Sequence, residues 1–341
     1  MNPLKIIHCA NFSQTKNGAV YYSIDNKITN GLIRNGHFVH NFSYRDIARS
    51  ITFFKSKKIG ASKMNISLIE TIRNIEPDIL LLGHSEIIYD ETLKTIKKLF
   101  PKIKILMWWV DPLINIKHII PRLELLDAFF ATTGVSELEK VFGEKYKNKF
   151  FYMPNCCDTS IEKLQSFNKK DKKYDLLFLG RYDDERNSFV EYIKNNFKEL
   201  EIGLFGNSKE TIIQGQDFFN TLINTKIGIN YSRFNDIDLY SSDRIIQLLA
   251  NGVFTLSPRI PNMELLFNDN EVIYFDNFED FKEKVSFYIK NEKDRNTIAI
   301  NGYKKAIKNF NSTRVTKFMI EAINQEFTEQ YEWLTQKDYL V

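Results

Sequence analysis

The chain has 341 residues, of which 43% are hydrophobic and 14% aromatic, enough apolar material for two packed cores and too much for a disordered protein. Its 47 Lys and Arg residues against 43 Asp and Glu leave a formal charge of +4, so we expect no nucleic-acid surface. Three cysteines build no disulfide framework, and no leading segment suits a signal peptide or a membrane span. We therefore expect a cytoplasmic protein.

In the first half of the chain, short apolar runs alternate with amphipathic helical stretches, which is typical of βαβ units and a parallel sheet. The predicted strands are Lys5–Ala10, Phe38–Phe42, Asp78–Leu82, Ile103–Val110, Ala128–Thr132 and Phe150–Met153. The predicted helices are Ala19–Asn35, Ile66–Asn74 and Thr92–Phe100. Uninterrupted apolar runs indicate strands that are covered on both faces.

The composition turns polar after Asp158, and the strand pattern begins again at Tyr174. We predict a first domain at 1–158, a linker at 159–173 and a second domain at 174–310. The second domain is expected to contain the strands Tyr174–Leu179, Glu201–Phe205, Ile227–Tyr231, Val253–Leu256 and Val272–Phe275. Because ligands of open α/β sheets bind beyond the carboxyl ends of the strands, we expect the chemistry there.

The most informative stretch is Tyr240–Gly252. Ser241 or Ser242 can cap a helix whose free N–H groups and positive dipole end would bind phosphate. Arg244 in the first turn adds a charge, and Gln247 one turn later can hydrogen-bond a ribose hydroxyl. An ordinary capped helix explains the same residues without a ligand, and the residues alone leave both interpretations open.

Three segments agree in order with one family. The run Asp243–Asp276 contains the frame R-x-x-[EQ]-x-x-A-x-G-x-x-x-[LI]-S, a proline loop, E-L-L-F and a strand that ends in aspartate. It resembles the C-terminal domain of GT-B glycosyltransferases. Tyr174–Arg181 with Glu185-Arg186 is similar to the strand and glycine loop that open that domain, and Phe151–Asn155 resembles the segment that closes the first domain. The nearest subgroup contains the CgeB-like spore-maturation proteins.

This resemblance implies an α/β fold of GT-B architecture, with two Rossmann-like domains facing a central cleft and C-terminal helices, 311–341, packing across to the first domain. It implies a glycosyltransferase that moves a sugar from a nucleotide-sugar donor to a hydroxyl of a glycan, a lipid-linked saccharide or another acceptor. Such enzymes usually need no metal, and the histidines and cysteines here lack ligand spacing. We therefore expect no metal and no cofactor, with the nucleotide-sugar as a substrate.

The resemblance also implies a donor site. The residues that would serve the donor phosphates are Gly180, Arg181, Arg186, Ser242 and Arg244. Gln247 stands where many relatives have a ribose-binding glutamate and is a weaker, uncharged acceptor. Asn262 and Glu264 are candidates for the sugar hydroxyls. Leu239 replaces a glutamate of many retaining relatives, so the stereochemical outcome stays open.

The first domain is expected to hold the acceptor and a general base, because transfer with inversion requires a group that removes the proton of the acceptor hydroxyl. Asp111 is the first candidate, since it follows the buried run Ile105–Val110 at the carboxyl end of a strand. A cap of the turn before Pro112 explains it equally well. His84 is the second candidate, with a hydrogen-bonded rim residue as the alternative.

Three residues are candidates for the acceptor. Asn11 and Gly18 lie in the loop after the first strand, which turn formation alone also explains. Trp109 can stack on a sugar, although strand alternation places at least one of Trp108 and Trp109 in the core. A different class of function, a non-catalytic nucleotide or sugar-binding module that partners an active transferase, stays open. The first βα turn lacks the G-x-G-x-x-G run of NAD-dependent enzymes.

The sequence leaves open whether the protein also contacts a membrane or a second copy of itself. The basic clusters Lys55–Lys58 and Lys94–Lys104 allow a peripheral contact at the inner face of the membrane, although solvated faces explain them too. The segment Trp333–Val341 allows a homodimer or a membrane surface contact, and its composition does not decide.

Overall fold

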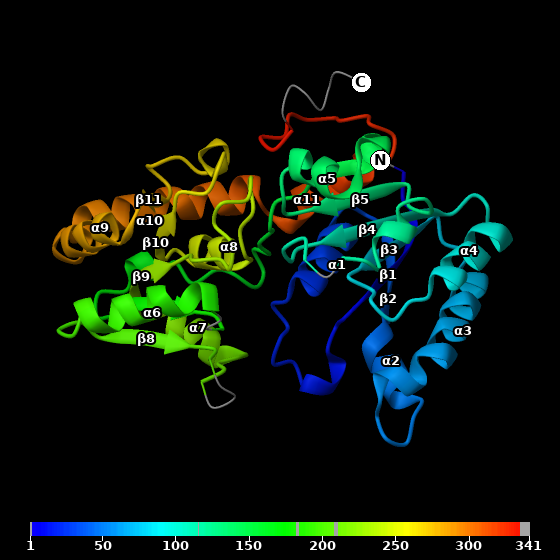
Figure 1. Cartoon of the computed structure of the whole chain (residues 1–341), viewed down its shortest axis with the longest axis horizontal. Coiled ribbons are helices and arrows are strands. Elements are labelled where there is room, and N and C mark those ends of the chain that lie inside the picture. Colours follow the sequence, from blue (N-terminus) through cyan, green and yellow to red (C-terminus); the bar gives the residue numbers. More distant parts are fainter. Residues whose placement is uncertain (1, 115, 182–183, 208–210, 335–341) are drawn as a thin grey trace. The chain divides into compact units, whose positions relative to one another are not determined.

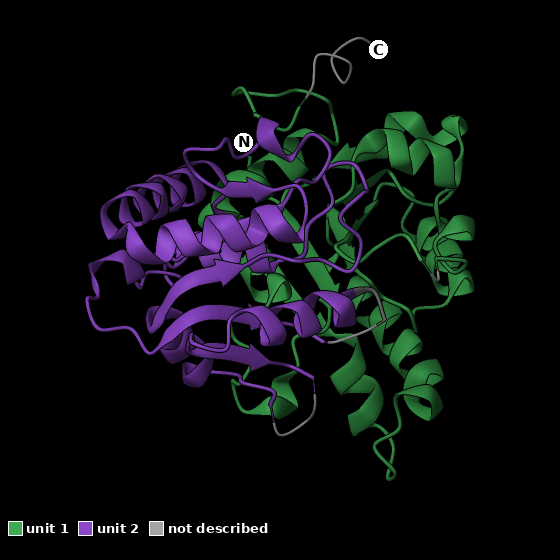
Figure 2. Ribbon diagram, turned by 60° about the vertical axis from the view of Figure 1, so that its left-hand side comes forward, with its two compact units in different colours: residues 1–154, 312–341 green, residues 155–311 purple. Residues whose placement is uncertain are grey.

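The structure is a computed structural model that describes residues 2–114, 116–181, 184–207 and 211–334 (Figure 1). The chain divides into two compact units, residues 1–154 with 312–341 (unit 1) and residues 155–311 (unit 2), as Figure 2 shows. Residues 159–173, which we predicted as a linker, are grouped with unit 2. Within the segment Trp333–Val341, for which the sequence allows a homodimer or a membrane surface contact, residues 335–341 lie outside the described part.

Unit 1 is built on a six-stranded parallel sheet with the strand order β2-β1-β3-β4-β5-β6. Its strands are β1 Lys5–Ala10, β2 Phe38–Ser43, β3 Ile79–Gly83, β4 Lys104–Trp109, β5 Ala128–Ala131 and β6 Phe150–Tyr152. Each agrees with its predicted strand to within one residue at either end. All five residues of β3 are buried, which confirms that its apolar run is covered on both faces.

The helices of unit 1 are α1 Ile24–Arg34, α2 Tyr44–Ser50, α3 Lys57–Ile75, α4 Asp90–Leu99, α5 Val135–Phe142 and α11 Ser312–Glu321. The sequence missed α2 and α5 and predicted only the second half of α3, and it started the first helix at Ala19, five residues before α1 begins. The first half of α3 has isoleucines on its solvent side and a buried Asn65, so its apolar period is weak. Asn65 is satisfied internally, because its Nδ2 donates to the Ala61 and Ile87 carbonyls at 2.8 and 2.9 Å.

Unit 2 is built on a five-stranded parallel sheet with the strand order β11-β10-β9-β7-β8. Its strands are β7 Tyr174–Leu179, β8 Ile202–Phe205, β9 Thr225–Ile229, β10 Phe254–Pro258 and β11 Ile273–Phe275. Its helices are α6 Asp184–Asn196, α7 Gln216–Ile223, α8 Arg244–Ala250, α9 Phe278–Lys290 and α10 Glu292–Asn309. All five predicted strands are present, with β9 starting two residues early.

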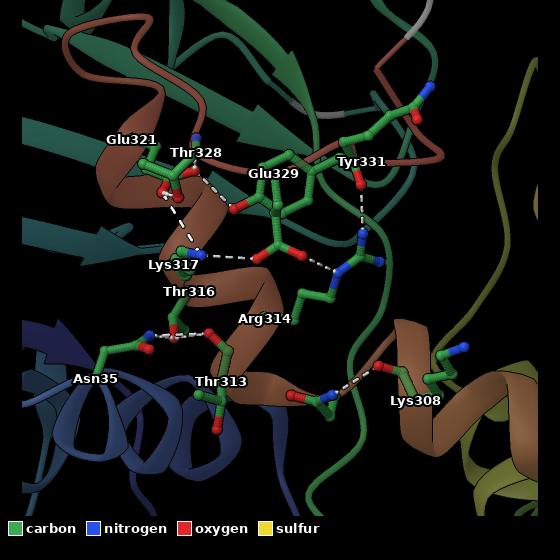
Figure 3. A network of polar contacts seen from close by, with 12 residues as sticks. Asn35, Lys308, Thr313, Arg314, Thr316, Lys317, Glu321, Thr328, Glu329 and Tyr331 are labelled. Carbon is green, nitrogen blue, oxygen red and sulfur yellow. Dashed lines mark hydrogen bonds and ion pairs between the residues drawn. The ribbon is translucent and has the colours of Figure 1, made fainter. Parts of the chain in front are cut away.

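The last helix, α11, returns to unit 1 and packs on α1. The two helices approach closely because position 31 is glycine, where a Cβ would lie 2.2 Å from the Ser312 carbonyl oxygen. Asn35 at the end of α1 fixes the pair, because its Nδ2 donates to the Thr313 carbonyl and to Thr316 Oγ1 at 2.8 and 3.0 Å (Figure 3). The predicted packing of C-terminal helices on the first domain thus takes the form of this helix pair.

The segment after α11 is held by charged contacts (Figure 3). The Arg314 guanidinium contacts the carboxylates of Glu329 and Glu332 at 2.8 and 2.6 Å and lies over the rings of Tyr331 and Trp333. Both rings are buried in unit 1. None of the helices in the described ranges combines the length and the hydropathy that a membrane span requires.

Candidate functional site

A pocket of about 240 Å³ opens at the carboxyl edge of the unit 1 sheet. Its walls come from the loops after β1, β3 and β4 and from α1 and α2, and they include Asn11, Asp25, Tyr44, Arg45, His84 and Asp111. Three residues that were predicted from separate parts of the sequence, Asn11, His84 and Asp111, therefore share one pocket. They meet because parallel strands end at the same edge of the sheet.

His84 and Asp111 form a pair in this pocket. His84 Nδ1 lies 3.5 Å from Asp111 Oδ2, and the exposed fractions of the two side chains are 20% and 65%. The imidazole stacks on the Trp109 indole with 4.2 Å between the ring centroids. Burial lowers the pKa of His84, and the Asp111 charge only partly opposes it. The imidazole is therefore neutral at pH 7 and has a lone pair for a proton.

The backbone at His84 is held in an unusual conformation. His84 and Ser85 have φ angles of +56° and +53°, in the left-handed region that costs non-glycine residues about 1–3 kcal/mol. Ser85 anchors the turn, because its Oγ donates to the Cys9 carbonyl at 3.3 Å and its own carbonyl accepts from Arg122 Nη1 at 3.0 Å. Such retained strain is typical of functional sites.

A charged cluster forms the side of the pocket at α2. Glu86 accepts from Arg45 Nε and Lys57 Nζ, both at 2.8 Å, and from the Tyr44 hydroxyl. Burial acts to raise the pKa of Glu86, but these three hydrogen bonds outweigh it and hold the pKa at about 2. The carboxylate therefore stays ionised and fixes Tyr44 and Arg45 as pocket walls.

Asp25 is a second acid of the pocket. Its Oδ1 accepts from the Asn11 N–H at 3.0 Å, and burial raises its pKa to about 6. Asn11 thus lines the pocket with its backbone N–H bound to Asp25, whereas Gly18 is exposed at φ +80° and is absent from the pocket lining. Trp109 is 7% exposed and supports His84, so a sugar does not reach its stacked face in this conformation.

A buried chain of hydrogen bonds that the sequence did not reveal fixes Trp108, another wall of the pocket. Trp108 Nε1 donates to His8 Nε2 at 3.0 Å, and His8 Nδ1 contacts Thr29 Oγ1 at 2.9 Å. The indole can only donate, so His8 is protonated on Nδ1, and burial lowers its pKa to about 3. Thr29 in turn donates to Asn41 Oδ1 at 2.9 Å. No motif spacing connects these four residues.

At the carboxyl edge of the unit 2 sheet, the central group is Arg244. Its side chain is 8% exposed and lies over the Phe178 ring at 5.0 Å. Its Nη1 donates to the Tyr231 carbonyl and to Ser242 Oγ at 3.1 and 3.0 Å, and its Nε donates to the Leu179 carbonyl. Within the described ranges, no carboxylate forms an ion pair with Arg244. Burial and then the neighbouring Arg186 charge lower the pKa of Arg244 to about 9.

Two glycines bring backbone close to this guanidinium. A Cβ on Gly180 would lie 2.8 Å from Arg244 Nη2 and 3.3 Å from Arg186 Nη1. Gly206 has φ +106°, and its Cβ would lie 3.0 Å from the Gly180 carbonyl carbon and oxygen. Glycine at position 206 therefore lets the ends of β7 and β8 approach, and glycine at position 180 leaves room for the Arg244 side chain. Arg181 is exposed, and residues 182–183 of the predicted phosphate loop lie outside the described part.

The predicted serine cap is wrong. The N-cap of α8 is Asp243, and its side chain makes no capping hydrogen bond. Ser241 Oγ lies 3.3 Å from Asn230 Oδ1 instead, and Ser242 Oγ accepts from Arg244. The serines are engaged because β9 ends beside them and supplies better partners than the short α8. The charge at this edge thus comes from the Arg244 side chain rather than from a helix terminus.

The remaining donor candidates have local partners. Gln247 Nε2 donates to Asp243 Oδ2 at 2.6 Å, one turn back on α8. Asn262 Nδ2 donates to Asp238 Oδ1 at 2.7 Å, and Asn262 and Glu264 are both exposed on the loop after β10. Leu239 is buried at φ +55°. None of the described contacts joins Asn262 or Glu264 to Arg244.

The sequence also missed a buried polar network beside Arg244. Asn155 Nδ2 donates to the Ser241 carbonyl at 2.9 Å, and Asn230 Nδ2 donates to Ser257 Oγ at 3.0 Å. Asn230 directly follows β9, a position that could have marked it. In the described part of the chain, no three His, Cys, Asp or Glu side chains gather as a metal site would require.

These features define a class of fold. The two parallel-sheet α/β domains are Rossmann-like, and the chain has the GT-B glycosyltransferase fold. Solved structures of similar fold include a glycosyltransferase from Rickettsia africae ESF-5, at TM-score 0.59 and 12% identity over 97% of this chain and 100% of that one. Another is HepE from Anabaena in complex with UDP and glucose, at TM-score 0.59 and 11% identity. The match covers 94% of this chain and 100% of HepE. A third is AviGT4, a glycosyltransferase of avilamycin A biosynthesis, at TM-score 0.62 and 10% identity. The match covers 95% of this chain and 98% of AviGT4.

A family model matches part of the chain. Residues 184–321, which include α6 to α11, match the model of a family described as glycosyl transferase-like. None of the curated proteins matches the chain significantly. The structural neighbours show the fold, and the family match over residues 184–321 supports a glycosyl transfer function.

Proposed function

We propose that the protein is a glycosyltransferase that moves a sugar from a nucleotide-sugar donor to a hydroxyl of a glycan, a lipid-linked saccharide or another acceptor. The observation that carries this proposal is Arg244, a buried cation at the carboxyl edge of the unit 2 sheet that forms no ion pair among the described residues and has only the charge of the neighbouring Asp243 carboxylate and Tyr240 to favour its charged form. A buried charge without a counter-ion is costly unless a ligand completes it. Its described hydrogen bonds engage Nε and Nη1, and Nη2 lies on the side of Gly180 and Arg186, where an anion would meet two guanidinium groups.

The donor class follows from the charge of this edge. Arg244 and Arg186 present two guanidinium groups beside glycine backbone, which suits the diphosphate of a nucleotide-sugar. The Anabaena HepE structures contain UDP and UDP-glucose, which supports a donor of this kind. We assign Gln247, Asn262 and Glu264 to the ribose and sugar hydroxyls, as the family resemblance implies.

For the chemistry, we propose His84 as the proton acceptor and Asp111 as the group that stabilises its charged form. The acceptor oxygen forms a bond to the anomeric carbon, the bond from that carbon to the diphosphate oxygen breaks, and the hydroxyl proton passes to the imidazole. His84 is the more enclosed of the two and is neutral at pH 7, whereas Asp111 is 65% exposed. Asp111 was the first candidate from the sequence, and the pairing gives it the supporting role.

We propose that transfer needs no bound metal, because the two arginines supply the positive charge that the leaving diphosphate requires. Chelation with EDTA should then leave the rate unchanged. Membership of the CgeB-like subgroup and a homodimer stay predictions from the sequence.

The donor site is tested by calorimetric titration with UDP, GDP and ADP. Arg244→Lys should weaken the nucleotide that binds by about tenfold or more, because a lysine cannot keep the fixed fork of contacts. Arg295→Lys is the matched control, since Arg295 is also buried and donates from Nη1 to the Tyr288 and Ile289 carbonyls. Absence of binding by every nucleoside diphosphate would sink the proposal.

The alternative, a non-catalytic binding module, predicts binding without turnover. Donor hydrolysis in the presence of the wild-type chain, lost in His84→Ala and reduced in Asp111→Asn, would exclude it. Activity that persists unchanged in both variants would instead remove the pair from the mechanism.

A further inference from the structure

The loop between α2 and α3 exposes two adjacent aromatic rings. Phe53 and Phe54 are 94% and 80% exposed, more than any other large hydrophobic side chain in the described ranges. Their rings contact each other edge to face at 5.5 Å between centroids, so they form one apolar tip. Figure 1 shows this loop projecting beyond the ends of α2 and α3. Exposed aromatic residues at a loop tip are unfavourable in water and indicate an interaction surface.

Helix α3 extends this apolar tip along its solvent side. Ile59 and Ile66 are 66% and 58% exposed and lie seven residues apart, which is two turns on one helix face. The opposite face contributes Met64 and Leu68 to the unit 1 core. The solvent side of α3 therefore exposes apolar side chains in addition to those that the helix buries in the core.

The charge around the tip has one sign. No acidic residue occurs between Asp46 and Glu70, whereas this stretch contains Arg49, Lys55, Lys57, Lys58 and Lys63. Arg49 and Lys57 form ion pairs with Asp46 and Glu86. The side chains of Lys55, Lys58 and Lys63 are exposed, and no described residue forms an ion pair with them. Three cations thus surround the apolar side chains.

We propose that this surface, formed by Phe53, Phe54, Lys55, Lys58, Ile59, Lys63 and Ile66, docks on an anionic lipid membrane. The phenylalanines enter the boundary between headgroups and acyl chains, and the lysines contact the lipid phosphates. An anionic bilayer can bind the phenylalanines and the lysines at the same time, because its acyl chains are apolar and its headgroups are negatively charged. A protein partner would need an acidic rim around an apolar groove of matching shape.

The position of the surface bears on the acceptor, and this step rests on the proposed function. The seven residues of α2 join the loop to the pocket, since Tyr44 and Arg45 begin the helix and line the pocket. A helix of this length spans about 10 Å. A docked tip would hold the α2 side of the pocket near the headgroups, separated by this helix and the short loop after it, which among the proposed acceptor classes favours a lipid-linked saccharide.

The test is co-sedimentation of the full chain with vesicles of phosphatidylglycerol and phosphatidylcholine, and with vesicles of phosphatidylcholine alone. We expect binding to the anionic vesicles that high salt weakens. Phe53→Ser with Phe54→Ser should reduce the affinity by roughly tenfold or more, because the inserted apolar area is lost. Lys55→Gln with Lys58→Gln should reduce the affinity by about 25-fold, which is roughly fivefold for each lysine.

Two matched controls keep the result specific. Phe287→Ser removes a half-exposed phenylalanine of α9 in unit 2, and Lys94→Gln with Lys98→Gln removes two exposed lysines of α4. Both should bind vesicles like the wild type. Equal losses in the controls and in the tip variants would overturn the assignment of the surface.

Insertion itself is measured with Phe54→Trp. The native tryptophans are all buried, so a blue shift of the new emission on anionic vesicles, and its quenching by spin-labelled lipid, reports the tip. No vesicle binding by the wild type would overturn the proposal. So would a dimer that dissociates in the Phe53→Ser and Phe54→Ser variant, because the surface would then serve a second copy of the chain. Neither result bears on nucleotide binding by unit 2, so each is separable from failure of the proposed function.

Discussion

His84 is placed by its surroundings rather than by its own side-chain preferences. The imidazole lies between the Trp109 ring and the Asp111 carboxylate, on a turn whose φ angles are positive at two successive residues. Trp108, which contacts His84 edge to face, is in turn fixed by His8. The reactive nitrogen therefore has one orientation before any substrate arrives, which lowers the cost of reaching the transition state.

A pH profile tests His84 at this scale. Because burial lowers its pKa, the base form is complete at neutral pH, and kcat/KM should fall about tenfold per pH unit below that pKa. His84→Ala should lower kcat by about 10²–10⁴-fold and remove this acidic limb. His40→Ala, on the edge strand β2, is the control and should keep the limb. An acidic limb that survives in His84→Ala would assign it to another group.

Asp25 offers a stability test in the same pocket. Its pKa is about 6 in the folded protein and 3.8 in the unfolded chain, so the folded state favours the protonated acid. Protonated Asp25 therefore contributes its full stabilisation of the folded state below pH 3.8, and this contribution is lost as the pH rises through 6. Asp25→Asn should therefore melt about 2–4 °C above the wild type at pH 8 and level with it at pH 4. A difference that does not change between these pH values would contradict the burial of this charge.

At the scale of elements, the contact of α1 with α11 depends on one missing side chain. Alanine usually stabilises a helix by about 0.5–1 kcal/mol relative to glycine. In Gly31→Ala the new Cβ would meet the Ser312 backbone and Thr316 Oγ1, so we expect a loss of about 1–3 kcal/mol instead. Unfolding in urea measures the sign. Ser62→Ala, on the exposed side of α3, should be nearly neutral.

The scale of the whole molecule shows how the chain divides. Unit 2 is one continuous segment whose ends meet, since Cys157 pairs with Asn311 and its N–H donates to the Phe310 carbonyl at 2.9 Å. Unit 1 is interrupted and closed by α11, whose Phe318 packs on Phe130 and Phe151. We therefore expect unit 2 to fold by itself and residues 1–154 of unit 1 to need α11 in order to fold.

Fragments of the chain test this division. A fragment of residues 155–311 should unfold cooperatively, and the nucleotide that binds the full chain should raise its melting temperature. A fragment of residues 1–154 should lack a cooperative transition until residues 312–341 are added, because the partner of α1 is missing. Calorimetry measures both, and a stable 1–154 fragment would show that α11 is dispensable.

The sequence by itself determined the strands and the residues at their ends. Apolar runs specify buried strands locally, so all eleven described strands were predictable, and so was the presence of Gly180, Arg244, His84 and Asp111 at carboxyl edges. Those signals lie within a few residues and need no knowledge of the fold. The serine cap failed because Ser241 and Ser242 had better partners in space than the helix beside them in the chain.

Only the tertiary structure decided which of these residues act together. The order β2-β1-β3-β4 brings His84 to Asp111, and it brings His8 to Trp108 across 100 positions of the chain. The same packing buried Arg244 among carbonyl oxygens and left Phe53 and Phe54 outside any core. Burial and pairing are properties of the packed chain, because desolvation and hydrogen-bond geometry depend on neighbours that sequence spacing does not specify.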